Sequence, residues 1–253
     1  MSVSDKTAII TGAGSKRGIG RATAHALAAA GWNVAILDID EAAAKDAATE
    51  VADRQSVHAV GLACDVTDET SVDLALDALA TAGPPVGALV NNAGITSPTP
   101  FLEVTGDEWD RIFAVNVRGA YNITRRIVPG MAERGFGRVV FLSSVSAERG
   151  GGVFGGVAYS AAKAAQLGFA RALAREAGPH GITVNSVAPG LIETDITAGK
   201  LDPERKDQLI AGIPVGRSGN VHDVAELITF LCREESGYIT GATYDVNGGA
   251  HIH

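Results

Sequence analysis

The sequence predicts one α/β domain built on a doubly wound, parallel β-sheet. Short apolar or β-branched runs alternate with longer amphipathic stretches throughout the chain, as expected for strands buried on both faces and for the helices that connect them. A length of 253 residues suits a single domain. No linker, repeat or low-complexity tract divides it. We therefore expect about seven parallel strands, with helices on both faces, in one unit spanning residues 1–253.

The individual elements follow from this alternation. The expected strands are Thr7–Thr11, Asn33–Asp38, Val57–Cys64, Val86–Asn91, Arg138–Ser143, Ile182–Ala188 and Ala242–Val246. The expected helices are Gly20–Ala30, Glu41–Arg54, Glu69–Ala82, Gly106–Val128, Tyr159–Gly178 and Val221–Cys232. Loops are expected at Ile95–Pro100, Gly150–Gly156 and Leu191–Asp202. Long irregular segments in compact domains are usually functional, so the region of about 191–212 is predicted to be a substrate lid.

Composition and charge restrict the partners. The chain is 46% hydrophobic and 20% charged, which is typical of a globular protein. Its formal net charge of -8 offers no basic surface for nucleic acid, for an anionic membrane or for an acidic carrier protein. No signal segment is evident, and no apolar run approaches the ~20 residues of a membrane span. The two distant cysteines, Cys64 and Cys232, favour a reduced, cytoplasmic protein without a metal site.

The first expected strand runs into a glycine-rich turn, Gly12–Gly20, and a helix follows. Glycine lets a backbone approach a pyrophosphate closely, and the next helix supplies free N–H groups and the positive end of its dipole. An ordinary tight strand-to-helix turn can have the same composition. The position after the very first strand favours a dinucleotide site.

Asp38 ends the second expected strand. A carboxylate at this point can accept hydrogen bonds from both hydroxyls of an adenosine ribose and would repel a 2′-phosphate, which favours NAD over NADP. Lys16 and Arg17 are the competing signal, because cations in the turn could bind that phosphate. We give Asp38 more weight, because the strand end fixes its position.

Tyr159 and Lys163 lie four residues apart in an expected helix and so share one face. An ammonium beside a phenol favours the phenolate, which lowers a pKa that is ordinarily about 10 and suits a base for alcohol oxidation. In an arbitrary helix such a pair more often shares only a solvent face. Here the strand end Ser143-Ser144 and a glycine-rich loop precede the pair, and these neighbours favour catalysis.

Six motifs in order give a family resemblance. They are Asn91-Asn92-Ala93-Gly94, Asn116 between Val115 and Val117, Ser143-Ser144, the Tyr159-x-x-x-Lys163 pair, Asn185 to Gly190 with Thr194 beyond it, and Asp245 to Gly249. Together, over residues 7–249, they resemble the short-chain dehydrogenase/reductase family, in particular its 3-oxoacyl-carrier-protein reductase-like branch. The resemblance implies a Rossmann-type domain and an NAD(P)-dependent oxidoreductase.

The resemblance also implies roles for individual residues. Tyr159 would be the acid/base, Lys163 would hold the nicotinamide ribose and lower the Tyr159 pKa, Ser144 would stabilise the substrate oxygen, and Asn116 would hold a water that continues a proton relay from Lys163. The implied cofactor-binding residues are Gly12, Ser15, Arg17, Gly18, Ile19, Gly20, Asp38, Ile39, Asp65, Val66, Asn92, Ala93, Gly94, Tyr159, Lys163, Pro189, Gly190, Ile192 and Thr194. The implied substrate contacts are Ser144, Ser146, Glu148, Arg149 and Tyr159.

Two intervals depart from the family pattern. The turn between Gly12 and Gly18 is longer than usual, which leaves the contacts of Ser15 and Arg17 open. The interval between serine and tyrosine is also long, and the usual spacing would fall on Ser146 instead of Ser144. We choose Ser144 because it follows the strand directly, and the glycine-rich loop can absorb the extra residues.

The expected function is hydride transfer between NAD and a small secondary alcohol or carbonyl compound, such as a polyol, a sugar or a hydroxy compound. Three features make the carrier-protein reductase the alternative and not the main expectation. They are the acidic net charge, Asp38, and His180, at a position where carrier-using members often have arginine. A non-catalytic dinucleotide-binding regulator is a third possibility. The resemblance further implies a homotetramer that pairs through the helices carrying Asn116 and Tyr159, where Gly168 and other small residues form an outer face.

Overall fold

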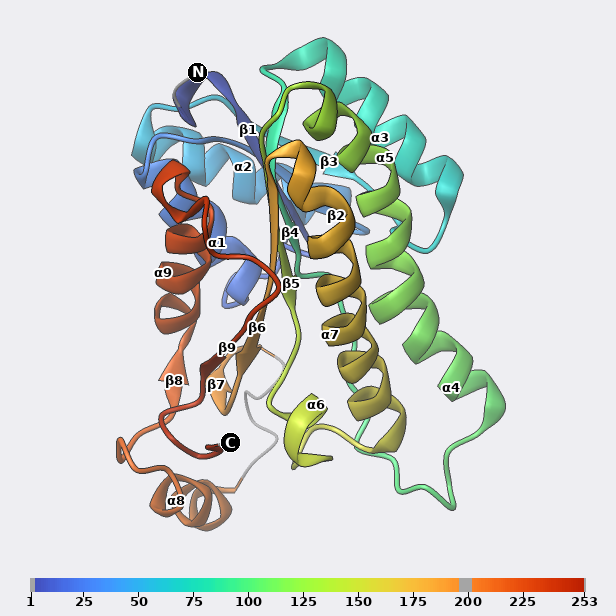
Figure 1. The fold of residues 1–253 in the computed structure, drawn as a ribbon. Helices are drawn as coiled ribbons and strands as arrows, with labels where there is room; N and C mark the ends of the chain where they lie inside the picture. The colour runs from blue at the N-terminus through green and yellow to red at the C-terminus, as the bar shows by residue number, and fades with distance from the viewer. Residues whose placement is uncertain (1–2, 196–201, 253) are drawn as a thin grey trace.

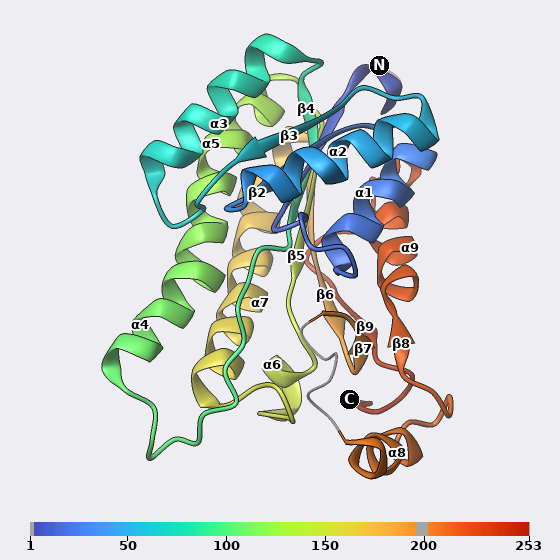
Figure 2. The ribbon, with the colours of Figure 1, turned by 180° about the vertical axis from the view of Figure 1, so that it is seen from behind.

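The structure is a computed structural model that describes residues 3–195 and 202–252. Its main sheet has seven strands in the order β3-β2-β1-β4-β5-β6-β9. Every neighbouring pair is parallel, which confirms the predicted doubly wound α/β class. Helices cover both faces of the sheet, with α1, α2 and α9 on one side and α3, α5 and α7 on the other (Figures 1 and 2).

The strands lie close to their predicted bounds, because the central ones are nearly continuous buried runs. They are β1 (Thr7–Thr11), β2 (Asn33–Asp38), β3 (Ala59–Ala63), β4 (Val86–Asn91), β5 (Gly137–Leu142), β6 (Ile182–Pro189) and β9 (Thr243–Val246). Two further short strands, β7 (Ile192–Glu193) and β8 (Gly219–Asn220), form a separate parallel pair.

Several helices are preceded by a residue whose side chain accepts a hydrogen bond from a backbone N–H of the first turn, as is typical of helix caps. Asp40 caps α2, Asp68 caps α3, Thr105 caps α4 and Asn220 forms a capping box on α9. The helices are α1 (Ile19–Ala29), α2 (Glu41–Gln55), α3 (Glu69–Ala82), α4 (Gly106–Phe113), α5 (Gly119–Glu133), α6 (Ser146–Arg149), α7 (Val157–Ala177), α8 (Pro203–Ala211) and α9 (Val221–Leu231). None of the helices among the described residues is long and apolar enough to cross a membrane.

The predicted helix over residues 106–128 is wrong in two respects. A π-helical turn, Ala114–Arg118, separates α4 from α5, and sequence periodicity does not reveal such a local widening. The helix also continues past Pro129 to Glu133. Proline costs a helix one hydrogen bond and some bending, and in this case the strongly amphipathic α5 continues regardless.

The segment predicted as a lid is only partly irregular. It contains β7 and, after residues that lie outside the described part, the helix α8 (Pro203–Ala211). Figure 1 shows α8 and α6 near the carboxyl ends of the central strands. The elements α6, β7 and α8 therefore lie at the edge of the sheet at which ligands bind in open α/β folds.

Two apolar clusters hold the layers together. One packs β1, β2 and β4 against α1, α2 and α9, with Leu27 and Trp32 fully buried. The other packs the opposite face against α3, α5 and α7, with Phe141 and Ile123 fully buried. Cys64 and Cys232 are free and belong to these cores. The sheet therefore forms a rigid platform for the loops at its carboxyl edge.

The strand order reverses direction between β1 and β4. Loops that follow neighbouring strands at this switch point diverge and leave room for a ligand. The glycine-rich turn follows β1, and the Asn92–Gly94 segment follows β4. The fold thus places both predicted dinucleotide segments at the expected crevice.

Candidate active site

Four predicted catalytic residues from three parts of the chain meet at the carboxyl edge of the sheet. Tyr159 and Lys163 lie on α7, with the Lys163 Nζ 5.7 Å from the centre of the Tyr159 ring. Ser144, just after β5, places its hydroxyl where it hydrogen-bonds the phenol. Asn116 lies in the π turn, and a Cβ at Gly94 would fall 2.6 Å from its Oδ1 and 3.4 Å from the Lys163 Nζ. The structure therefore assembles the predicted group.

Lys163 is held by backbone and side-chain acceptors. Its side chain is 4% exposed, and its Nζ donates to the Leu142 carbonyl at 2.6 Å and to the Gln166 Oε1 at 3.3 Å. The Ser143 hydroxyl donates to the Lys163 backbone carbonyl at 2.9 Å, which ties α7 to the end of β5. Ser143 thus has the structural position that its place beside Ser144 suggested.

The expected lowering of the Tyr159 pKa is wrong for this arrangement. Burial raises the pKa of the phenol, and the hydrogen bond with Ser144 opposes that rise. Burial also lowers the pKa of Lys163 to about 7.

Asn116 is buried and oriented by backbone groups. Its Nδ2 donates to the carbonyls of Ile95 and Ile112, each at 2.9 Å. Its Oδ1 is buried without a partner. Its backbone carbonyl accepts from the Gln166 Nε2 at 2.6 Å. Gln166 thus links Asn116 to Lys163 through its side-chain amide, and the water implied for the proton relay stays a prediction.

The two candidate serines lie side by side. The Ser146 backbone N–H donates to the Ser144 Oγ at 3.1 Å. A Cβ at Gly155 would fall 3.0 Å from the Ser146 Oγ and 2.7 Å from the Tyr159 Cδ1. The glycine-rich loop thus covers both Ser146 and the phenol ring. Ser144 contacts the Tyr159 hydroxyl, whereas Ser146 faces the loop.

The glycine-rich turn packs tightly against the end of β4. Gly12 has φ +63°, and a Cβ there would fall 2.7 Å from the Ala93 Cα. The Asn92 Nδ2 donates to the carbonyls of Thr11 and Gly12, each at 2.8 Å. α1 begins after Gly18 with no side-chain cap, so its first N–H groups are available to a phosphate, as an anion site requires. This arrangement fits a dinucleotide diphosphate.

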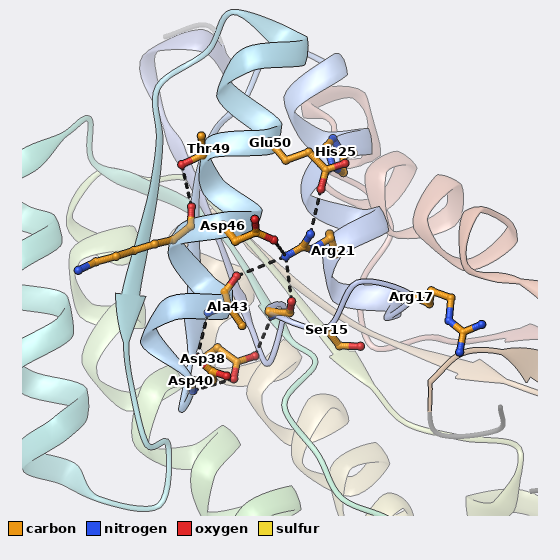
Figure 3. A network of polar contacts seen from close by, with 12 residues as sticks. Ser15, Arg17, Arg21, His25, Asp38, Asp40, Ala43, Asp46, Thr49 and Glu50 are labelled. Carbon is orange, nitrogen blue, oxygen red and sulfur yellow. Dashed lines mark hydrogen bonds and ion pairs between the residues drawn. The ribbon is translucent and has the colours of Figure 1, made fainter. Parts of the chain in front are cut away.

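Asp38 is fixed at the end of β2 by two backbone donors. Its Oδ2 accepts from the Gly14 N–H at 2.8 Å and its Oδ1 from the Asp40 N–H at 3.1 Å (Figure 3). The neighbouring Ile39 is 75% exposed, so its side chain is accessible to a ligand beside Asp38. The geometry agrees with a site for the adenosine half of a dinucleotide.

Arg21 is a residue that the sequence analysis missed. Its buried guanidinium donates to the Gly14 and Ala43 carbonyls at 3.0 and 3.3 Å, and to Asp46 and Glu50, each at 2.9 Å (Figure 3). It thereby joins the glycine-rich turn to α2. Its place directly after Gly20, at the start of a helix that packs on α2, is the signal that could have indicated it.

Ser15 and Arg17 contact a segment that lies far away in the sequence. The Ser15 Oγ donates to the Asp195 Oδ2 at 2.7 Å, and the Arg17 Nε donates to the Asp195 Oδ1 at 2.7 Å. These bonds lower the pKa of Asp195 to about 2. In Figure 3 Arg17 lies away from Asp38, on the other side of the turn.

Comparison with known proteins agrees with this geometry. Residues 12–251 match the family model described as enoyl-(acyl carrier protein) reductase. A protein of Sinorhizobium fredii, described as an uncharacterized short-chain type dehydrogenase/reductase, is 49% identical over the whole of both chains. The chain belongs to the short-chain dehydrogenase/reductase family.

Two further relatives have names that state an activity. The 3-oxoacyl-[acyl-carrier-protein] reductase of Escherichia coli is 38% identical over 252 residues, covering 100% of each chain. The acetoacetyl-CoA reductase of Shinella zoogloeoides is 37% identical over 247 residues, covering 96% of this chain and 98% of the relative. The family resemblance is thereby confirmed over the full length of the molecule.

Other predicted cofactor-binding residues of this short-chain dehydrogenase/reductase lie around the carboxyl edge of the sheet. The Asp65 Oδ1 accepts from the Thr67 N–H and hydroxyl, and the Val66 carbonyl accepts from Asn122. Gly190 packs on Asn247, and Ile192 is buried. The remaining cofactor candidates, Pro189 and Thr194, lie at the end of β6 and just after β7.

The predicted substrate contacts of this short-chain dehydrogenase/reductase differ in exposure. Ser146 is buried at the start of α6. Glu148 is partly buried, and its Oε2 lies 3.9 Å from the His251 Nε2. Arg149 is exposed at the end of α6. The C-terminal segment therefore packs against the helix that carries the predicted substrate residues.

Proposed function

We propose that this oxidoreductase reduces the 3-oxo group of an acyl thioester to a 3-hydroxy group. The observation that carries the proposal is the meeting of the Tyr159 and Ser144 hydroxyls beside the buried Lys163. Two relatives that match nearly the whole chain are named for 3-oxoacyl and acetoacetyl-CoA reduction, and these names support the substrate class.

The chemistry assigns a role to each side chain. A bound nicotinamide dinucleotide supplies the hydride. Tyr159 donates its proton to the carbonyl oxygen, since burial raises its pKa and keeps the phenol protonated. Ser144 donates a hydrogen bond to the same oxygen, where negative charge develops. Lys163, between Tyr159 and Gly94, is placed to bind the ribose hydroxyls.

For the cofactor we propose NAD. Asp38 presents a carboxylate held by Gly14 and Asp40, and a carboxylate repels a 2′-phosphate. Two arginines of the turn region are otherwise engaged, because the exposed Arg17 pairs with Asp195 and the buried Arg21 pairs with Asp46 and Glu50. Reductase relatives that use an NADP-type cofactor would be expected to present a free cation at this point.

A second candidate is oxidation of a small polyol or another secondary alcohol. Glu148 favours it, because a partly buried carboxylate two residues beyond Ser146 could accept hydrogen bonds from substrate hydroxyls. The net charge of -8 also disfavours docking of an acidic carrier protein. A purely regulatory dinucleotide binder is disfavoured by the assembly of Asn116, Ser144, Tyr159 and Lys163.

A substrate panel distinguishes these candidates. We would follow the absorbance of reduced nicotinamide with acetoacetyl-CoA, with acetoacetyl-carrier protein and, in the oxidative direction, with polyols and sugars, each with NAD(H) and NADP(H). We expect the highest kcat/KM with acetoacetyl-CoA and NADH. Turnover of a polyol alone would favour the second candidate, and nucleotide binding without any turnover would favour a regulator.

We further propose that the protein self-associates through α4, α5 and α7. The outer face of α7 has small exposed residues, including Gly168 and Ala172, and a Cβ at Gly168 would contact nothing within 4 Å. Such a face lets a second helix approach closely. Ala172→Arg should lower the mass measured by light scattering, whereas an unchanged mass would count against this interface.

A further inference from the structure

Gln166 occupies a position between two residues of the candidate site. It follows Lys163 by three positions on α7 and is fully buried. Its Oε1 accepts from the Lys163 Nζ at 3.3 Å, and its Nε2 donates to the Asn116 backbone carbonyl at 2.6 Å. An ammonium can only donate and a carbonyl can only accept. The two partners therefore allow only this orientation of the amide.

The acceptor on Asn116 belongs to an unusual turn. Asn116 is at the centre of the π-helical segment Ala114–Arg118, where the ordinary hydrogen bonding from residue i to i+4 is interrupted. The same residue presents a buried Oδ1 without a partner beside Gly94. The π turn and Gln166 thus form one buried polar group around Lys163.

The Lys163 ammonium has few hydrogen-bond acceptors around it, so it depends on the Gln166 amide. Leu142 supplies the other acceptor for its Nζ, and the neighbours from the loop after β4 and from the π turn, Gly94 and Asn116, are neutral. Among the described neighbours, Tyr159 is the one other titratable group. A buried ammonium with so few acceptors depends strongly on each of them.

We propose that Gln166 is a positioning residue whose amide, anchored on the Asn116 backbone carbonyl, holds the Lys163 ammonium toward Tyr159. This inference rests on the proposed function.

Two substitutions separate this role from simple packing. Gln166→Leu keeps the volume but removes both hydrogen bonds. Gln166→Ala leaves a polar space that a water can fill, because Lys163 and Asn116 offer it partners. Packing alone predicts that the alanine variant is worse than the leucine variant in both stability and kcat. The positioning role predicts that the alanine variant is less stable and yet has the higher kcat.

The pH profile gives the direction of the effect. In Gln166→Leu the ammonium loses an acceptor, its pKa falls, and less positive charge remains to favour the phenolate. The acidic limb of kcat for oxidation of 3-hydroxybutyryl-CoA should then move upward by about one pH unit, with roughly a tenfold lower kcat near neutral pH. Gln55→Leu, on α2 and outside the site, is the matched control.

Titration of lysine-labelled protein by NMR tests the inference without turnover. We expect the Lys163 signal to titrate at lower pH in Gln166→Leu than in the wild type. An unchanged lysine titration together with an unchanged pH profile would overturn the role of Gln166, as would an alanine variant slower than the leucine variant. Failure of the wild type to turn over any thioester would contradict the proposed function, and the lysine titration would still decide the role of Gln166.

Discussion

The Asp38 carboxylate accepts a hydrogen bond from the Gly14 N–H at 2.8 Å, which joins the end of β2 to the turn after β1. This contact fixes one oxygen of Asp38 and leaves the carboxylate at the crevice formed by the two segments. A Cβ at Gly14 would fall 2.9 Å from the same oxygen, so the glycine is needed for the approach. The cofactor preference depends on this pair.

Asp38→Ala should therefore weaken NAD binding and relax the rejection of NADP. We expect the Kd for NAD to rise roughly tenfold or more, which is the size of one or two lost charge-assisted hydrogen bonds. Calorimetric titration with both nucleotides measures the change. Asp53→Ala, which removes an exposed carboxylate from α2, is the charge-matched control. An unchanged ratio of the two affinities would remove the argument for NAD.

Arg21 also holds the glycine-rich turn, through its hydrogen bond to the Gly14 carbonyl. Arg21→Met removes the bonds to Gly14 and Ala43 and the ion pairs with Asp46 and Glu50, of which Glu50 keeps its pair with Arg54. We expect a loss of stability of about 1–3 kcal/mol and weaker nucleotide binding, because Gly14 is no longer held. Thermal unfolding and calorimetry report the two effects separately. Full stability with normal NAD affinity would show that the network has no positioning role.

The choice between the two serines is testable by substitution. Ser144→Ala should lower kcat by about 100-fold, because a hydrogen bond to the developing oxyanion is lost. Ser146→Ala should have a smaller effect on kcat and act mainly on KM, since Ser146 faces the glycine-rich loop. The reverse order in steady-state kinetics would assign the catalytic hydroxyl to Ser146.

Lys163 links the stability of the protein to pH. Burial lowers its folded-state pKa from the ordinary 10.5 to about 7. Between these values the unfolded chain binds more protons than the folded one, so this group adds stability as the pH rises from about 7 toward 10.5. Lys163→Met should remove that dependence and stabilise the nucleotide-free protein near pH 7, by on the order of 1 kcal/mol. Denaturant unfolding at several pH values would detect it, and equal slopes in both proteins would contradict the burial effect.

The parts of the fold that sequence could predict are those set by local pattern. The predicted bounds are correct for β1, β2, β4 and α3, because continuous apolar runs and amphipathic periodicity are visible in the sequence itself. The π turn at Asn116 has no such periodic signal. The short strands β7 and β8 pair with each other although α8 lies between them in the sequence, and a two-residue strand leaves little pattern to read.

The candidate site likewise contains residues that the sequence could predict and contacts that it could not. Tyr159, Lys163, Ser144 and Asn116 could be found because each belongs to a short motif. The contacts of Arg21 with α2 and of Ser15 with Asp195, which are 180 residues apart, depend on tertiary packing and could not be found in this way. The pKa of Tyr159 could not be predicted either, because burial decides its direction and only the folded structure shows the burial.

Substitution of the phenol tests the central claim most directly. We would compare wild-type protein and Tyr159→Phe for reduction of acetoacetyl-CoA by NADH, with nucleotide binding measured by calorimetry on the same samples. The account predicts at least a ~100-fold lower kcat for the phenylalanine variant, with nucleotide affinity and thermal stability close to those of the wild type. A Tyr159→Phe protein that turns over acetoacetyl-CoA at the wild-type rate would contradict it.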